Sequence, residues 1–157
     1  MKRTVGATAI MLLLFVFAGA ATARPSGSET ITTTLFFPSF PSSAPFVGTY
    51  SGTFSASGAV TDTGTVTAQA LFGAFPSPVA AVLQTVRTLS GSDGTLTLRC
   101  NQRIFPHGQS TSVVSNTGSC AVLTATGAYA GLRGSGSLTG TTDLGATPPT
   151  VQDVLVL

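Results

Sequence analysis

His107 is the only histidine of the chain, so it is the first residue to consider as a catalytic group. A serine hydrolase holds a serine, a histidine and an aspartate together, and the chain contains residues of all three types. It has no G-x-S-x-G segment, however, and His107 stands between Pro106 and Gly108, as in a loop. One histidine and scattered carboxylates are also a poor ligand set for a metal ion. We therefore predict no catalytic residue and no metal site.

The aspartates are interpreted as turn formers rather than general acids. Short acidic side chains accept hydrogen bonds from nearby backbone N–H groups in turns. Four aspartates lie in or near segments that favour turns: Asp62, Asp93, Asp143 and Asp153.

A glycine-rich segment at residues 125–136 is where cofactor binding could be argued. It lacks a G-x-G-x-x-G fingerprint, since Thr139 stands where the third glycine would follow Gly134 and Gly136. It also lacks the Lys-Ser/Thr end of a phosphate-binding loop. Glycines at these spacings permit tight turns and close approach of strands. We predict a structural role and no cofactor.

The two cysteines, Cys100 and Cys120, are predicted to form one disulfide bond, as is usual in an exported chain. A bridge that closes a loop of this size stabilises a fold by roughly 3 kcal/mol on the chain-entropy model. The chain has no C-x-x-C segment for redox chemistry. We expect a structural bridge between the core-facing sides of two strands.

Strands must position these residues, because apolar residues alternate with serine and threonine at period two. Residues 79–89 also match helical spacing, but the turn-rich residues 90–94 that follow favour a strand. Strands are predicted over residues 30–37, 49–56, 65–72, 82–89, 95–101 and 150–157, with one more around Cys120 and Val122. The last strand is expected to pair with the first and close a barrel. Inward positions are expected at Tyr50, Phe54 and Ala56, at Val66, Ala68, Ala70 and Phe72, and at Leu96, Leu98 and Cys100.

Four segments are predicted to interrupt the strands. Residues 38–45 contain three prolines, which cannot donate to a strand ladder. Residues 62–64 are predicted to form a turn, and residues 73–78 to form a break. Residues 105–118 are rich in polar and small residues and are predicted to form a long loop tied at its base by the disulfide.

The N-terminal residues 1–23 have the features of a cleaved signal peptide. Lys2 and Arg3 precede a short apolar run at residues 10–18, and Ala21-Thr22-Ala23 offers a small-x-small cleavage site. The apolar run is shorter than the roughly 20 residues of a membrane span, although an uncleaved N-terminal anchor is the alternative. We expect one exported domain at residues 24–157 with no stable membrane span after cleavage.

The charge of this mature region argues against nucleic acid as a partner. Five arginines, Arg24, Arg87, Arg99, Arg103 and Arg133, face five acidic residues, Glu29 and the four aspartates above. A nucleic-acid-binding protein clusters its basic residues on one face, and these arginines are scattered along the sequence.

The segment from Thr126 to Gly136, preceded by Gly94-Thr95-Leu96-Thr97-Leu98, resembles the glycine-rich signature of small secreted proteins with the allene oxide cyclase-like or dirigent-like β-barrel. The resemblance implies an all-β fold, a single antiparallel barrel of about eight strands with an apolar interior. It also implies a strand, a turn and the next strand at Gly127, Tyr129, Gly131, Arg133, Gly134 and Gly136. The polar interior residues of the plant cyclases and dirigent proteins have no matched positions here, so no catalytic role is carried over. Tyr129 and Arg133 are interpreted as a packing and a surface residue.

Three functions follow as expectations. The first is an exported, non-enzymatic barrel that binds a small apolar ligand or a surface component. The alternative is an isomerase or cyclase of the allene oxide cyclase type, acting on a lipid-derived or phenolic substrate. A second alternative is a structural or adhesive envelope protein. Convergent polar groups in an open interior favour the enzyme, whereas a filled interior counts against the first two. The ligand and the oligomeric state are left open.

Overall fold

The computed structural model describes residues 27–37, 47–77, 80–110 and 112–157. The predicted signal peptide at residues 1–23 and the loop predicted at residues 38–45 lie outside these ranges. Within the ranges, no helix has the length and apolar character to span a membrane.

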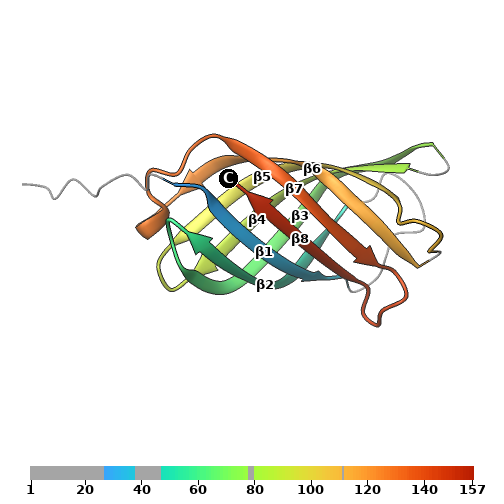
Figure 1. The fold of residues 1–157 in the computed structure, drawn as a ribbon, viewed down its shortest axis with the longest axis horizontal. Coiled ribbons are helices and arrows are strands. Elements are labelled where there is room, and N and C mark those ends of the chain that lie inside the picture. Colours follow the sequence, from blue (N-terminus) through green and yellow to red (C-terminus); the bar gives the residue numbers. More distant parts are fainter. Residues whose placement is uncertain (1–26, 38–46, 78–79, 111) are drawn as a thin grey trace, which may run out of the picture.

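Eight antiparallel strands form a single closed barrel in which each strand pairs with its neighbours in sequence (Figure 1). This confirms the predicted all-β barrel. The strands are β1 (Glu29–Phe36), β2 (Gly48–Gly58), β3 (Asp62–Ser77), β4 (Ala80–Gly91), β5 (Thr95–Pro106), β6 (Val113–Ala125), β7 (Ser135–Asp143) and β8 (Thr150–Val156). One 3-10 helix, η1 (Gly127–Tyr129), lies between β6 and β7.

The predicted closure of the barrel by the last strand is confirmed. β8 pairs with β1 in antiparallel register, with Leu155 opposite Ile31 and Asp153 opposite Thr33. Glu29 and Leu157 exchange backbone hydrogen bonds of 3.0 and 2.8 Å at the end of this seam. Because every described strand has a partner on both sides, neither β1 nor β8 leaves a free sheet edge.

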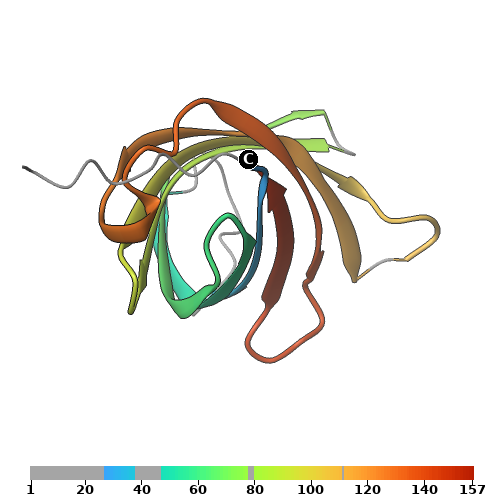
Figure 2. The ribbon, with the colours of Figure 1, turned by 60° about the vertical axis from the view of Figure 1, so that its left-hand side comes forward.

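Alternation along the strands separates an apolar interior from an exterior dominated by serine and threonine. Along β2, for example, Tyr50, Phe54 and Ala56 are buried on the inward face, whereas Ser51, Thr53 and Ser55 are exposed. The predicted inward positions of β5 are confirmed, since Leu96, Leu98 and Cys100 are each 0% exposed. The strands curve around a closed interior (Figure 2), and each of the eight strands contributes buried side chains to it.

Phe72 does not point inward as predicted. The pairing of β3 with β4 shifts between Ala70 and Phe72, so Leu71 is an extra residue with no opposite partner. A bulge of this kind reverses the alternation beyond it. Phe72 is consequently 48% exposed on the outer face, whereas Val66, Ala68 and Ala70 are buried as expected.

Three predicted interruptions are wrong in position. Residues 73–78 were expected to break the chain, yet β3 continues to Ser77 with a second register shift after Ala74. Most of the loop predicted at residues 105–118 pairs in β5 and β6, which leaves only residues 107–112 as the connection. The turn predicted at residues 62–64 belongs to β3, and the chain reverses at residues 59–61. In each case, hydrogen bonding to a neighbouring strand outweighs a loop-like local composition.

Candidate functional site

A belt of polar side chains crosses the interior of the barrel at mid-height. Its members come from five strands and are each at most 2% exposed: Thr33, Arg87, Asn116, Thr142 and Asp153. Their strand partners are mostly apolar or glycine, so the belt is surrounded by core. A polar group in such surroundings costs free energy unless it finds a partner.

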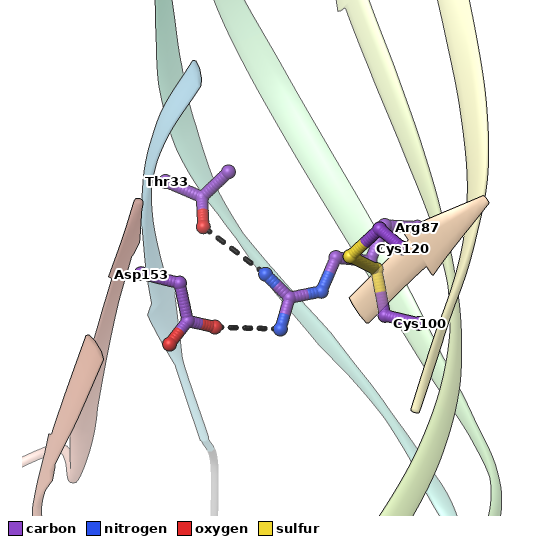
Figure 3. The surroundings of a disulfide bond; sticks show 5 residues. All are labelled: Thr33, Arg87, Cys100, Cys120 and Asp153. Carbon is purple, nitrogen blue, oxygen red and sulfur yellow. Dashed lines mark hydrogen bonds and ion pairs between the residues drawn. A yellow bond between two sulfur atoms is a disulfide. The ribbon is translucent and has the colours of Figure 1, made fainter. Parts of the chain in front are cut away.

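Arg87 reaches from β4 across the barrel to the opposite wall (Figure 3). Its Nη2 donates to Asp153 Oδ2 at 2.6 Å, which makes a fully buried ion pair, and its Nη1 donates to Thr33 Oγ1 at 3.2 Å. Asn116 Nδ2 donates to Asp153 Oδ1 and to Thr142 Oγ1, both at 3.0 Å. The Asp153 carboxylate is thus held from two sides, and the belt ties β1, β4, β6, β7 and β8 together.

The interpretation of Asp153 as a turn former is therefore wrong. It lies in the middle of β8, between Val151 and Leu155 on the inward face. Asp143, in contrast, does stabilise a turn, because its Oδ1 accepts from the backbone N–H groups of Gly145 and Ala146. Asp93 also lies in a turn, between β4 and β5.

Three buried polar atoms on the wall formed by β4 and β5 have no hydrogen-bond partner among the described residues: Thr85 Oγ1, Arg87 Nε and Gln102 Nε2. Thr85 lies opposite Cys100, and Gln102 lies opposite Leu83, so the two are diagonal neighbours across the strand pair. Arg87 Nε and Gln102 Nε2 can only donate, and the Thr85 hydroxyl can do either. This wall is suited to receive a hydrogen-bond acceptor.

An enclosed cavity of about 20 Å³ lies beside this wall, towards the end of the barrel where β1 ends. It has room for about one water molecule. Gln102 and Thr142 supply its polar lining, and the rest of the lining consists of Phe37, Tyr50, Leu83, Ile104, Val114 and Val151. The rings of Phe37 and Tyr50 meet edge to face with centroids 4.1 Å apart. Burial raises the pKa of the Tyr50 phenol.

Tyr129 and two carboxylates occupy the other end of the barrel, where β1 begins. Tyr129 is 0% exposed and donates from its hydroxyl to Asp62 Oδ2 at 3.3 Å. Burial, followed by the negative charge of Asp62 and the hydrogen bond to it, raises the pKa of Tyr129. For Asp62, burial acts to raise the pKa, but hydrogen bonds from Thr63, Ser92, Asp93 and Tyr129 together lower it. Glu29 Oε2 accepts from Val60 N at 2.9 Å, and burial raises the pKa of this carboxyl.

The glycine-rich segment forms the turn between β6 and β7 at this end of the barrel (Figures 1 and 2). Tyr129 is the last residue of η1 within this turn. Gly127, Gly131 and Gly134 have φ angles of 60°, 122° and 99°. At Gly127 a Cβ atom would also lie 2.1 Å from the carbonyl oxygen of Asp93, so only glycine fits. Gly136 lies in β7. Arg133 is exposed, and its Nη1 donates to the carbonyl of Leu132.

The predicted disulfide is confirmed. Cys100 and Cys120 lie directly opposite each other on β5 and β6, with Cα atoms 4.0 Å apart. Both cysteines are buried, and the bridge lies close to the root of the Arg87 side chain (Figure 3).

His107 lies outside the barrel in the connection after β5. Its Nδ1 is 2.7 Å from Ser115 Oγ in an exposed contact, and neither side chain is hydrogen-bonded to the polar belt among the described residues. No carboxylate hydrogen-bonds to His107 in the part of the chain that the structure describes, so a hydrolase triad is not assembled there. The described ranges also hold no group of three or more metal-ligating side chains.

The polar belt was missed because each of its residues was interpreted singly. Period two places Arg87 on the same face as Leu83 and Leu89, and it places Asp153 on the same face as Leu155. This alternation is visible in the sequence and indicates that two opposite charges lie inside the barrel. Their direct contact depends on β4 and β8 lying on opposite walls, which requires the closed topology.

Searches against family models, curated proteins and solved structures found no match to this chain.

Proposed function

We propose that this protein is an exported barrel that binds a small molecule without transforming it. The ligand has an apolar body and one hydrogen-bond acceptor, and it occupies the interior near Gln102. The observation that carries the proposal is the Gln102 amide, which is 4% exposed, lacks a partner for Nε2 within the described residues and lines an otherwise mainly apolar cavity. A buried donor left without an acceptor costs about 1–3 kcal/mol, and a ligand acceptor would recover that cost.

The size of the cavity restricts the ligand. About 20 Å³ holds one water molecule, so a larger ligand must displace the edge-to-face pair of Phe37 and Tyr50. The Arg87–Asp153 pair lies deeper and fills the barrel at mid-height. We infer that this pair limits how far a ligand can enter.

Native mass spectrometry of the protein purified from its producing cells, with organic extraction of bound material, tests this proposal. The expected result is a stoichiometric ligand that is lost in Gln102→Leu. The matched control is Gln69→Leu, which removes an exposed glutamine from the outer face of β3 and should retain the ligand. Protein that carries only water, or a ligand retained by Gln102→Leu, contradicts interior binding.

The proposed export rests on the signal peptide predicted at residues 1–23, and the disulfide is consistent with an oxidising compartment outside the cytoplasm. The intact mass of the protein from its producing cells tests this part. A chain that begins at Arg24 is expected, and a retained leader would favour the N-terminal anchor instead.

A cyclase of the allene oxide cyclase type is the second candidate, favoured by the convergence of Arg87, Asn116 and Asp153 inside the barrel. Such groups could orient the oxygen atoms of a reactive substrate. All three side chains are buried and already engaged in hydrogen bonds with one another, which leaves none of them free to act on a substrate. Conversion of an added lipid epoxide or phenolic radical by the protein, and its loss in Arg87→Met under conditions where that variant keeps the circular dichroism of the parent, would favour the cyclase.

A further inference from the structure

A second candidate site lies on the outside of the barrel, over the three strands β3, β4 and β5. It is an open groove of about 280 Å³. Phe72, Val82, Gln84, Asn101 and Arg103 contribute outward-facing side chains to its lining. Leu83 and Gln102 complete its lining and also line the interior cavity, but its outward-facing side chains are used by none of the functions above.

The bulge at Leu71 creates the apolar part of this groove. Without the extra residue, Phe72 would continue the inward series of Ala68 and Ala70. With it, Phe72 lies outward and directly opposite Gln84, and its ring is about half exposed. Bulges often redirect a side chain for function, and an exposed aromatic ring offers a flat face to the C–H groups of a ligand.

The polar part of the groove is prearranged. Gln84 lies opposite Asn101, and Gln84 Nε2 donates to Asn101 Oδ1 at 2.9 Å. This bond fixes both amides and leaves Gln84 Oε1 as an acceptor and Asn101 Nδ2 as a donor, neither with a partner in the described ranges. An acceptor and a donor side by side match two neighbouring hydroxyl groups, each of which can donate and accept.

The aromatic ring and the two amides form one row across the sheet. Phe72 is opposite Gln84, and Gln84 is opposite Asn101. Neighbouring strands lie about 4.8 Å apart, so the row spans about 10 Å. This length suits one or two sugar rings that stack on Phe72 and extend over the amides.

The groove carries positive charge without a countercharge. Arg103 lies two residues beyond Asn101 on the outer face of β5, and Arg99 lies two residues before it. Neither arginine forms an ion pair with any described residue. A guanidinium group binds a carboxylate through two parallel hydrogen bonds.

We propose that this groove binds an acidic saccharide that contains hexuronate units. The sugar ring stacks on Phe72, two neighbouring hydroxyls bond to the Gln84–Asn101 pair, and the carboxylate pairs with Arg103. Each part of the groove matches one feature of such a sugar. An anion without a ring would not use Phe72, and a neutral sugar would not use Arg103.

Calorimetric titration with a galacturonate trimer tests the proposal, with the fully methyl-esterified trimer as the uncharged comparison. The acid form is expected to bind and the ester to bind more weakly. Phe72→Ala and Arg103→Gln should each weaken binding of the acid form by about tenfold or more, as expected when a stacking or charge-assisted contact is lost. Both side chains are exposed, so the unfolding midpoints should stay unchanged.

Two variants serve as matched controls. Phe36→Ala removes an exposed ring on β1, and Arg133→Gln removes an exposed arginine outside the groove. Neither should alter the affinity. The proposal is overturned if the trimer does not bind, if the ester binds equally well, or if Arg133→Gln weakens binding as much as Arg103→Gln. Binding that salt abolishes and Phe72→Ala leaves unchanged would also overturn it, because it would indicate attraction by charge alone.

Discussion

Arg87 is the most costly side chain to bury in this protein, and its contacts show how the cost is offset. Asp153 neutralises it at 2.6 Å, Thr33 accepts a second hydrogen bond, and Asn116 holds the far oxygen of Asp153. A buried ion pair of this kind contributes little net stability, because desolvation opposes the attraction between the charges. Its clearer effect is to join opposite walls of the barrel in one arrangement.

Replacing Arg87 by methionine should therefore destabilise the protein more than replacing the pair. Arg87→Met leaves Asp153 buried without its countercharge and is expected to cost about 3–5 kcal/mol of unfolding free energy. The double variant Arg87→Met, Asp153→Leu removes both charges and should recover most of that loss. Urea unfolding measures both, with the exposed Arg99→Met as control. A double variant as unstable as the single one would show that packing, not charge, dominates.

Glu29 gives the stability a dependence on pH. Its pKa in the folded protein is raised above 4.5 by burial, and Oε1 has no hydrogen-bond partner within the described residues. The folded state therefore favours the protonated form, and stability is lost as pH rises from 4.5 through the raised pKa. Asp62 acts in the opposite sense, because its lowered pKa makes stability fall when the pH drops below 3.8.

Glu29→Gln should remove the loss of folding stability above pH 4.5. It should keep the loss of stability in acid that Asp62 causes. The variant is expected to unfold at higher temperature than the parent near neutral pH, with the difference shrinking as the pH falls to 4.5. Thermal unfolding followed across this range measures it, with the exposed Asp93→Asn as control. A difference that does not change with pH would contradict the assignment to Glu29.

The strands themselves were largely predictable, because a half-buried strand repeats every two residues. β2 and β5 follow this repeat over the residues predicted from sequence. The pairing of β8 with β1 could be predicted because the chain ends in an apolar run that needs a partner strand. The bulge at Leu71 was not predictable, since an extra residue in one strand is defined only by the strand opposite. Residues 105–106 and 113–118 were not predicted as strand for a related reason. Their loop-like composition does not show that β5 and β6 pair with each other along them.

The candidate sites were less accessible to sequence than the fold. The disulfide could be predicted because two cysteines allow one intramolecular pairing. The polar belt and the outer groove both depend on residues that are distant in sequence and adjacent only across strands, such as Phe72, Gln84 and Asn101. These residues are brought together by the register of the strands in the closed sheet. The sequence alone does not give that register, so neither site could be predicted from it.

Deleting residues 151–157 should abolish soluble expression. The deletion removes β8 after its first residue, leaves β1 and β7 with unpaired edges, and takes Asp153 away from Arg87. Expression of the truncated chain, followed by fractionation into soluble and insoluble protein, measures this. A soluble product with the circular dichroism of the parent would refute closure by β8.

The barrel as a unit presents a surface rich in hydroxyl groups and poor in charge. β2 exposes Thr49, Ser51, Thr53, Ser55 and Ser57 along one face. Residues 24–157 contain five arginines and five acidic residues, so their formal charge is close to zero. Such a surface provides little electrostatic repulsion between copies, which is the physical basis of the structural or adhesive alternative.

Self-association should accordingly be strongest near neutral pH and weaken in mild acid, where carboxylates gain protons and the net charge becomes positive. Light scattering at increasing protein concentration measures this. A stable monomer at high concentration and neutral pH would remove the structural or adhesive alternative and leave the two binding proposals unaffected.

The seam between β1 and β8 also sets an order of events during synthesis. β8 follows every other described strand along the chain, so it is the last of them to leave the ribosome or an export channel. Until then, Arg87 lacks its ion-pair partner Asp153, and the barrel is open between β1 and β7. Water can reach the polar belt through this opening. The nascent chain can form hairpins early, but it cannot become a barrel until its final strand has been delivered. Folding of this protein is therefore completed after translation of β8, in whichever compartment receives that strand.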